Sequence, residues 1–376
     1  MMNLFERFEV LEDPRDIRGK KYKLTDILVM TIYGLLCGLK DFSNIADFMK
    51  LKEDYFTKLL NLKNGTPSHD CLSDLFASID SKKFMEIFIE WTKDIVKNKT
   101  GKNISIDGKA VKSATDKINN GNIPYIVSAF IGEIGLSIGQ VKVDDKSNEI
   151  TAIPDLLDLL EIKGATITID AIGTQEEIVN KIVSKGAHYV LPVKDNQREL
   201  RKQIKSQFES YNNLYGNSEV FHDKTIEKGH GRIEERNYFL TYNVSKIQDK
   251  EKWKTVKALA YMRVKKTENE ETTIVDNYYI IDSEIEIEEL IKSIRDHWSI
   301  ECGLHWRLDV ILDEDHSRNR EGNSINNLSI MRKIVFNLAS LDNRFGKVPL
   351  QRKLTRYMLE FENIEKLIFE VIPNIS

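Results

Sequence analysis

Two matching strings contain the residues best suited to metal chemistry. The sequence reads ISID at 104–107 and ITID at 167–170, so each string ends in an aspartate. The alternation predicts strands in which the isoleucines face the core and the aspartates face the opposite side. If the two strands are parallel neighbours, Asp107 and Asp170 lie side by side at one sheet edge, where α/β sheets tend to bind ligands.

Two carboxylates at that separation repel each other and need a counter-charge. Mg²⁺ supplies one, because it prefers a few carboxylate oxygens together with water and substrate phosphate. Paired metals about 3.5–4 Å apart activate the attacking oxygen and stabilise the leaving oxygen in phosphodiester displacement. The alternative is local: Asp107 begins a turn before Gly108, and Asp170 caps the helix that follows it.

A third carboxylate is expected from a later element. Glu301, in HWSIECGLHW, is the best candidate, because it lies on a predicted helix at helical spacing from Trp298 and His305. Asp309 and Asp313 compete with it, although their i, i+4 spacing also fits a solvated helix face.

Residues 1 to about 100 are expected to form a separate, all-helical domain. Leu24–Leu39 is apolar on every side, which predicts a helix packed at the centre of a small bundle. The other predicted helices are Ser43–Met49, Asp54–Leu62, Ser68–Ile79 and Ser81–Lys97.

From residue 101 the pattern is that of an α/β core, with an interruption. Strands are predicted at 104–107, 124–131, 136–143, 165–170 and 188–191, with helices at 150–160 and 175–184. A slip of the apolar phase at Gly139 indicates a β-bulge. Residues 195–282 begin with a helix at 197–208 and continue with strands around 219–225, 233–241, 256–264 and 273–281.

The helical pattern resumes at Ser283, where Ser283 and Glu286 have capping-box spacing, and continues past Trp298. A last helix is predicted at 327–341. The domains are therefore expected to be 1–100, a core of 101–194 and 283–345, an insertion of 195–282 and a tail of 346–376.

Composition limits the class of protein. The 376 residues include 55 Lys and Arg and 59 Asp and Glu, so the net charge of −4 excludes a uniformly basic DNA binder. Three cysteines without a C-x-x-C pair argue against a disulfide framework and a four-cysteine zinc site. The amino terminus lacks signal-peptide order, and no apolar run is long enough to cross a bilayer. A cytoplasmic protein without membrane association is expected.

Five strings carry a family resemblance. IDGKAVKSA, TIDAIGTQ, VLPVKDNQ, KGHGRIEER and HWSIECGLHWRLDVILDEDHSR resemble, in order, those of the insertion-sequence transposases that include the H-repeat-associated proteins. The order of predicted elements is similar to that of the RNase H-like fold. The resemblance covers nearly the whole chain, including its helical amino-terminal region.

This resemblance implies a DDE-type transposase of bacterial origin, associated with the nucleoid when it binds DNA. The implied catalytic and metal-binding triad is Asp107, Asp170 and Glu301, with Mg²⁺ as cofactor and Mn²⁺ as a substitute. The implied activity is cleavage at transposon ends followed by joining of the freed 3′ hydroxyl to target DNA. The implied partners are double-stranded DNA with terminal inverted repeats and target DNA, and a homodimer is expected in the synaptic complex.

One pattern departs from related transposases with a strand-rich insertion. Many of them carry Tyr, Arg and Lys at fixed spacings around the catalytic glutamate, where this chain has Ile294, His297 and Leu308. Arg295 and His297 are candidates to take over the phosphate contacts. The departure leaves the route of second-strand cleavage open.

Local cations are the candidates for DNA contact. Residues 181–205 carry 7 Lys and Arg and 2 acids (7 − 2 = +5), and residues 316–356 carry 9 and 2 (9 − 2 = +7). A solvated helix face explains the same runs. The further DNA-binding candidates are Lys109, Lys112, Lys194, Asn196, His230, Arg232, Arg318 and Arg320.

Two of these candidates have local alternatives. Asn196 and Glu199 have capping-box spacing, so a helix cap explains Asn196 as well as a phosphate site does. His230 and Arg232 lie in a Gly-x-Gly segment that also reads as a hairpin turn.

A zinc site could be suggested by the cluster of His297, Cys302 and His305. Only Cys302 and His305 have the spacing of zinc ligands, and no second pair is visible, so a zinc site is not favoured. Cys302 is expected to be buried and inert. Core packing is favoured over base stacking for Trp253 and Trp298. Two functional alternatives remain: a transposase remnant that only binds DNA, and a structure-selective nuclease such as a junction resolvase.

Overall fold

The computed structural model describes residues 4–16, 20–112, 123–143, 149–211, 213–229, 231–317 and 319–372. Within them, the strands form a nine-stranded sheet in the order β3-β2-β1-β4-β5-β9-β8-β7-β6. Their bounds are β1 Asn103–Ala110, β2 Tyr125–Ile131, β3 Leu136–Val143, β4 Thr166–Ile169, β5 His188–Val193, β6 Phe221–Gly229, β7 Arg232–Thr241, β8 Ala258–Glu268 and β9 Glu271–Ile281.

The first five strands have the RNase H-like order, β3-β2-β1-β4-β5. β2 and β3 are antiparallel, whereas β1, β4 and β5 run parallel. The predicted fold class is confirmed. β9 then pairs antiparallel with β5, so the strands of the insertion extend the same sheet.

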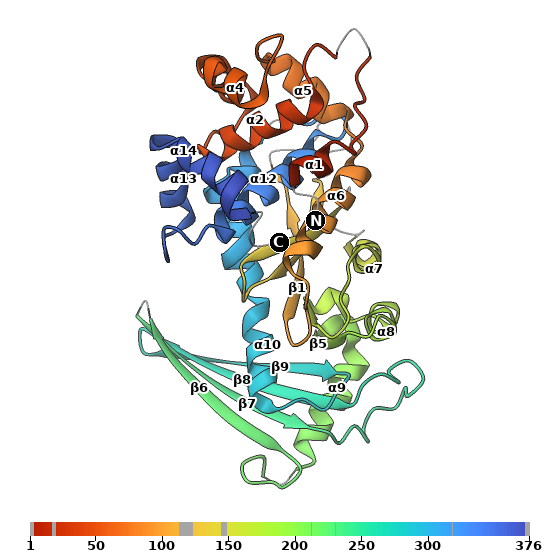
Figure 1. Cartoon of the computed structure of the whole chain (residues 1–376). Coiled ribbons are helices and arrows are strands. Elements are labelled where there is room, and N and C mark those ends of the chain that lie inside the picture. The colour runs from red at the N-terminus through yellow and green to blue at the C-terminus, as the bar shows by residue number, and fades with distance from the viewer. Residues whose placement is uncertain are drawn as a thin grey trace. The chain divides into compact units, whose positions relative to one another are not determined.

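The chain divides into two compact units, which are described separately. The first consists of residues 1–98, 108–152 and 301–376, and the second of residues 99–107 and 153–300. Both β1 and α7 (Glu149–Leu159) are divided between the units. The order and colours of the elements can be followed in Figure 1.

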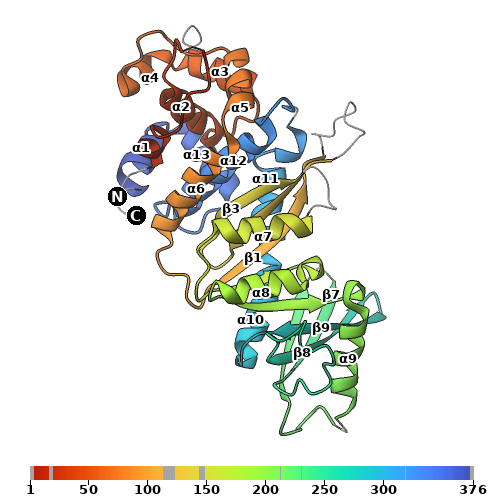
Figure 2. The same cartoon turned by 90° about the vertical axis from the view of Figure 1, so that its right-hand side faces the viewer.

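The first unit is mainly helical. Its remaining helices are α1 Leu4–Phe8, α2 Leu24–Leu36, α3 Phe42–Leu51, α4 Glu53–Leu60, α5 His69–Ser78, α6 Ser81–Ile95, α11 Trp306–Val310, α12 Ser324–Leu341, α13 Leu350–Leu359 and α14 Glu362–Lys366. All residues of α2 except Asp26 are buried, as its apolar sequence predicts. α12 packs against α2, α5, α6 and β3, so residues 1–98 share one core with the later helices of this unit (Figure 2).

Residues after 346, expected as a tail, include two packed helices. α13 lies against α2 and α12. Tyr357 of α13 is completely buried, and its hydroxyl donates to the Asp342 carboxylate at 2.8 Å. Because α13 is amphipathic, it becomes a core element only when α2 and α12 offer it an apolar surface.

The β2–β3 hairpin contains the predicted bulge. Ala129 pairs with Gly139, whereas Phe130 pairs with Ser137, so Ile138 has no partner across the ladder. The extra residue accounts for the slip of the apolar phase seen in the sequence.

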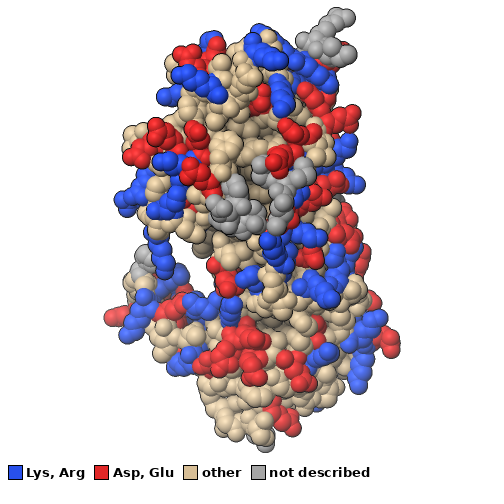
Figure 3. Space-filling model, viewed as in Figure 1, with Lys and Arg blue, Asp and Glu red and all other residues tan. Residues whose placement is uncertain are grey.

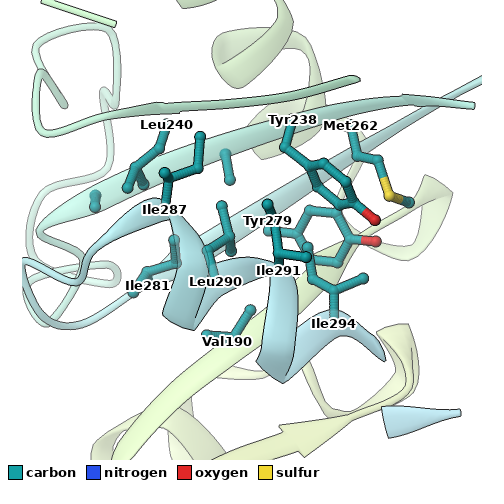
Figure 4. Close-up of a cluster of buried hydrophobic side chains, with 12 residues drawn as sticks. Val190, Tyr238, Leu240, Met262, Tyr279, Ile281, Ile287, Leu290, Ile291 and Ile294 are labelled. Carbon is teal, nitrogen blue, oxygen red and sulfur yellow. The ribbon is translucent and has the colours of Figure 1, made fainter. Parts of the chain in front are cut away.

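The second unit contains α8 Glu176–Ser184, α9 Arg198–Glu209 and α10 Ile287–His297. Figure 4 shows the apolar side of α10 against the sheet, with Leu290 and Ile291 facing Leu240 and Tyr279. On the other face, Phe208 of α9 packs near Tyr261. The insertion is therefore a sheet covered by one helix on each face.

The helix after the insertion begins later than the capping box predicts. Glu286 is the residue that precedes α10, and it makes no side-chain capping bond. The Ser283 hydroxyl is buried without a hydrogen-bond partner, so the predicted box does not form. The end of β9 holds Ser283 outside the helix, which overrides the local signal.

In the part of the chain that the structure describes, no helix is both long and apolar enough to span a membrane. Lys, Arg, Asp and Glu are interspersed over the face shown in Figure 3. This mixture agrees with the near balance of charges in the composition.

Candidate catalytic site

The two aspartates of the matching strings lie where two adjacent parallel strands stop pairing. The register pairs Ser105 with Thr168 and Ile106 with Ile169, so Asp107 follows the last β1 residue that pairs with β4, and Asp170 directly follows β4. β1 itself continues to Ala110, so the expectation that Asp107 ends its strand is wrong. Neighbouring strands lie about 4.8 Å apart. The two aspartates therefore occupy neighbouring positions of adjacent strands within the second unit.

Asp170 also makes the local contact that the alternative predicts. Its Oδ1 atom accepts the Ala171 N–H at 3.0 Å and caps a 3₁₀ turn, Ala171–Gly173. The Lys194 ammonium group lies 3.5 Å from the same oxygen. The Asp170 side chain remains 56% exposed, so capping does not bury the carboxylate.

A ladder of hydrogen bonds supports the strands directly below the aspartates. The Thr168 hydroxyl donates to Ser105 Oγ at 3.3 Å, and the Ser105 hydroxyl donates to the Asp296 carbonyl at 3.1 Å. Asn103 Nδ2 donates to the Asp296 carboxylate at 2.7 Å and Asn103 Oδ1 accepts from Ser293 at 2.9 Å. These bonds join the carboxyl end of α10 to β1 and β4.

The ladder explains residues whose role the sequence did not reveal. Ser105 and Thr168 stand two positions before the aspartates and face the same side of their strands. Their repetition in both strings was the available signal. The sequence could not identify the partner, Asp296, because it lies more than 120 residues further along the chain.

His297 interacts electrostatically with the two aspartates. Its Nδ1 atom lies 3.2 Å from the Thr168 hydroxyl. Burial lowers the pKa of His297 despite the opposing charges of Asp107 and Asp170, and Lys194 acts in the same direction as burial. The imidazole is therefore neutral at pH 7 and can offer a hydrogen bond without adding charge.

Asn196 does not form the predicted capping box. The residue that precedes α9 is Gln197, and Asn196 Nδ2 instead donates to the Ala171 carbonyl at 2.7 Å. The 3₁₀ turn at 195–197 moves the helix start past Asn196. Asn196 therefore holds the segment that directly follows Asp170.

Glu301 lies in the first unit, at the start of a π-helical turn, Glu301–His305, that directly precedes α11. Such turns are rare and often occur at functional sites. A Cβ atom on Gly303 would lie 3.1 Å from the Phe130 ring, so the turn packs closely on β2.

Cys302 is exposed, and the expectation of a buried thiol is wrong because the π-helical turn points it outward.

The two adjacent aspartates fit a hard cation by the chemistry of their oxygen donors. Among the residues that the structure describes, no three His, Cys, Asp or Glu side chains are grouped to hold a metal ion. The zinc interpretation of His297, Cys302 and His305 therefore gains no support. The assignment of Glu301 as the third ligand stays a prediction.

The predicted DNA-binding cations differ widely in their environments. Lys109 is only 10% exposed and is surrounded by carboxylates. Lys112 is 75% exposed and lies 3.5 Å from Asp315.

Arg232 pairs with Glu234, and Arg295 pairs with Glu227 of β6. Arg320 is exposed, whereas His230 and Arg318 lie outside the described residues.

Three of the nine Lys and Arg in the run at 316–356 do not reach the surface. Arg332 and Lys333 are each 1% exposed and Lys353 is 7% exposed, because α12 and α13 turn these residues inward. The run at 181–205 does reach the surface, although most of its cations have acidic neighbours. These pairs are Lys181 with Asp158, Arg201 with Asp195, Lys202 with Glu199 and Lys205 with Glu209.

A hollow of about 330 Å³ lies beside α9. It is lined by Asp195, Arg198, Arg201, Lys202, Lys205, Asp276 and Tyr278. Four of these side chains are cationic and two are acidic, so an excess of positive charge remains (4 − 2 = +2). The guanidinium of Arg201 lies over the Tyr278 ring.

The two tryptophans considered for base stacking have opposite environments. Trp253 is 5% exposed, as core packing predicts. Trp298 is 61% exposed, so the expectation that it packs in the core is wrong. It directly follows α10, whose apolar side is already filled by the isoleucines and leucine that face the sheet.

Comparison with known proteins identifies the class of this chain. Residues 104–338 match the family described as "Transposase DDE domain", and residues 5–92 match the family described as "DDE_Tnp_1-associated". The chain belongs to the DDE-domain transposase family, and the predicted family is confirmed.

Two relatives match this chain over nearly its whole length. The chain is 36% identical to "Putative transposase YncI" of Escherichia coli O157:H7 over 98% of this chain and 95% of the relative. It is 34% identical to "H repeat-associated putative transposase YhhI" of Escherichia coli K12 over 96% of each. A solved structure of a piggyBac transposase synaptic complex with hairpin DNA matches with a TM-score of 0.43 and 10% identity, over 98% of this chain and 76% of that one.

Proposed function

We propose that this chain is an active transposase that cleaves DNA at transposon ends and joins the freed 3′ hydroxyl to target DNA. The observation that carries the proposal is the placement of Asp107 and Asp170 directly after the last paired residues of the adjacent parallel strands β1 and β4. In α/β sheets this edge is where ligands bind. Membership of the DDE-domain family supports the same chemistry.

Asp107, Asp170 and Glu301 are the proposed ligands of Mg²⁺, for which Mn²⁺ would substitute. Bound magnesium supplies activation of the attacking oxygen and stabilisation of the leaving oxygen. The protein contributes the carboxylates, and the ladder below Asp107 and Asp170 holds their strands together. No side-chain nucleophile is required, because water and then the DNA 3′ hydroxyl attack phosphorus.

Positive and polar side chains near the aspartates are proposed to hold the DNA backbone. Lys194 lies beside Asp170, and neutral His297 can donate a hydrogen bond to a phosphate oxygen. The cation-lined hollow beside α9 begins at Asp195, directly after Lys194. A DNA strand leaving the aspartates along α9 would therefore meet an excess of positive charge.

The remaining regions are assigned by the same proposal. Residues 1–100 recognise terminal inverted repeats or support synapsis. Residues 101–194 and 283–345 form the catalytic core, residues 195–282 the insertion and residues 346–376 its carboxyl-terminal extension. Because two DNA ends must be joined together, the synaptic complex contains a homodimer.

The decisive experiment uses DNA that carries the element's own terminal repeats. Nicking is measured with Mg²⁺, with Mn²⁺ and with chelator for the natural protein and for Asp107→Asn and Asp170→Asn. Asp158→Asn, which changes a 58% exposed aspartate on α7, is the matched control. Loss of nicking by on the order of 10³-fold in the two site variants is expected, because metal ions supply several kcal/mol.

DNA affinity, measured by gel mobility, should survive in both site variants. Metal-dependent nicking that persists in either variant would refute the assignment. Binding without cleavage under any divalent cation would instead identify a remnant that only binds DNA. Preference for branched DNA without joining of ends would identify a junction nuclease.

A further inference from the structure

Lys109 does not have the surroundings of a DNA-contacting lysine. Its Nζ atom lies 2.7 Å from Glu314 Oε2 and 3.6 Å from Asp315 Oδ1, and it also pairs with Asp309. The side chain of Glu314 is 2% exposed and that of Asp315 17% exposed. The ammonium group is therefore enclosed by three carboxylates within the first unit.

Two cations of α12 form a second layer around the same carboxylates. Arg332 and Lys333 are each 1% exposed, and both lower the pKa of Glu314 together with Lys109, against the effect of burial. Arg332 Nε donates to the Leu312 carbonyl at 3.1 Å, and Lys333 Nζ donates to Ser329 Oγ at 3.0 Å. Fixed hydrogen bonds thus hold the second layer in place.

These six residues, the Lys109 cluster, are electrically balanced. The cluster consists of Lys109, Asp309, Glu314, Asp315, Arg332 and Lys333, with three acids and three bases (3 − 3 = 0). Burial alone would lower the pKa of Lys109, but Glu314 and Asp309 outweigh it and raise that pKa. Removing one member of such a balanced, buried set leaves a charge without compensation.

The cluster joins the two segments that carry the predicted catalytic acids. Lys109 lies two residues after Asp107 on the same strand and faces the same side. Asp309, Glu314 and Asp315 follow Glu301 on the segment that begins with the π-helical turn. The positions along the chain therefore make Lys109 a link between the end of β1 and that segment.

The end of β1 lies against the Glu149 side chain, and the π-helical turn packs on the ring of Phe130. A Cβ atom on Gly108 would meet the Glu149 carboxylate, and one on Gly303 would lie 3.1 Å from the Phe130 ring. Because packed interiors transmit strain, loss of the buried Lys109 contacts is expected to shift the backbone that these contacts hold. A displacement of about 1 Å at a catalytic group can reduce a rate by roughly 10²-fold.

We propose that Lys109 is a positioning residue that clamps the end of β1 to the segment following Glu301, and that it does not contact DNA. The inference rests on the proposed function only for its effect on cleavage. Its effects on stability and on DNA affinity are independent of whether the chain cleaves DNA.

The test compares Lys109→Met, Glu314→Gln and the double variant in the full chain. Lys82→Met, which removes an exposed lysine from α6, is the matched control. Three quantities are measured: the urea midpoint, the affinity for terminal-repeat DNA with its salt dependence, and single-turnover cleavage at saturating DNA as a function of Mg²⁺ concentration.

Both single variants should lower the urea midpoint, and the double variant should lower it by less than the sum. Such non-additivity is the signature of two groups in direct contact. DNA affinity should stay within about twofold of the natural protein, because no phosphate contact is lost. Cleavage should fall by about 10²-fold in both single variants and stay low in the double variant, since the link remains broken.

Three results would overturn the proposal. Weaker DNA binding with a smaller salt slope and an unchanged urea midpoint in Lys109→Met would make Lys109 a phosphate contact. Additive changes in the urea midpoint would show that Lys109 and Glu314 are not energetically coupled. Full recovery of cleavage in the double variant would show that the Lys109 cluster only balances charge and that Lys109 does not position the segment following Glu301. Absence of cleavage by the natural protein would refute the proposed function, while the midpoints and affinities would still test the clamp.

Discussion

Two acidic regions of this chain use their carboxylates in opposite ways. Where β1 and β4 stop pairing, beside Asp107, Asp170 is 56% exposed and its lysine neighbour is 3.5 Å away. In the Lys109 cluster, Glu314 is 2% exposed and the Lys109 ammonium lies 2.7 Å away. Burial with a tightly held cation commits a carboxylate to structure, whereas exposure beside a second carboxylate leaves it available to a ligand.

The largest effects should come from neutralising one acid in each region. Glu314→Gln is expected to reduce the free energy of unfolding by about 3–5 kcal/mol, because it leaves buried cations uncompensated. Asp170→Asn should change that energy by less than about 1 kcal/mol, because the residue is exposed and its lysine contact is loose. Urea denaturation of both variants measures the difference, and equal effects would break the contrast between the regions.

The tryptophans extend the contrast between buried and exposed groups. Trp253→Ala should reduce the free energy of unfolding by about 3–5 kcal/mol, because it empties a core position. Trp298→Ala should change it by no more than about 0.5 kcal/mol, since a 61% exposed ring loses little packing. Thermal or urea unfolding checks both values. A large loss for Trp298→Ala would mean that the ring is buried against another surface in solution.

Lys333 allows the Lys109 cluster to be tested by pH. Burial lowers the pKa of Lys333 to about 8, against the opposing effect of Glu314. The unfolded lysine, with an ordinary pKa of 10.5, binds more protons than the folded one between these values, so stability should rise as pH increases from about 8 towards 10.5. Unfolding curves across this range for the natural protein and Lys333→Met isolate the lysine, since the variant should lose that part of the rise. Identical pH dependences would show that folding does not lower the pKa of Lys333.

The smallest effects are expected on the exposed face of α9. Lys202 pairs with Glu199 at 2.7 Å, and both side chains are more than 70% exposed. Lys202→Gln should change the free energy of unfolding by less than about 0.5 kcal/mol. If α9 follows the DNA backbone, the slope of log affinity against log salt should fall by about 0.9, because one phosphate contact is lost. An unchanged slope of log affinity against log salt would show that Lys202 does not contact a DNA phosphate.

Much of the fold could be predicted because its signals are local. Strands predicted at 124–131 and 136–143 correspond to β2 and β3, and the helix predicted at Ser81–Lys97 corresponds to α6, Ser81–Ile95. The two matching strings predicted the juxtaposition of Asp107 and Asp170, because strand alternation and parallel order determine which side chains share an edge. Capping boxes were less informative, since tertiary packing moved the helix starts past Ser283 and Asn196.

The order of elements, the family and the pair of neighbouring aspartates could be predicted from the sequence, because alternation, helical spacing and motif order are local properties of the chain. The role of each cation depends on the folded structure. Lys109 looked like a phosphate contact when its neighbours were Asp107 and Gly108, but folding surrounds it with acids from 200 residues later. A charge takes its role from the groups that folding brings around it, and for Lys109 those groups lie far away in the sequence.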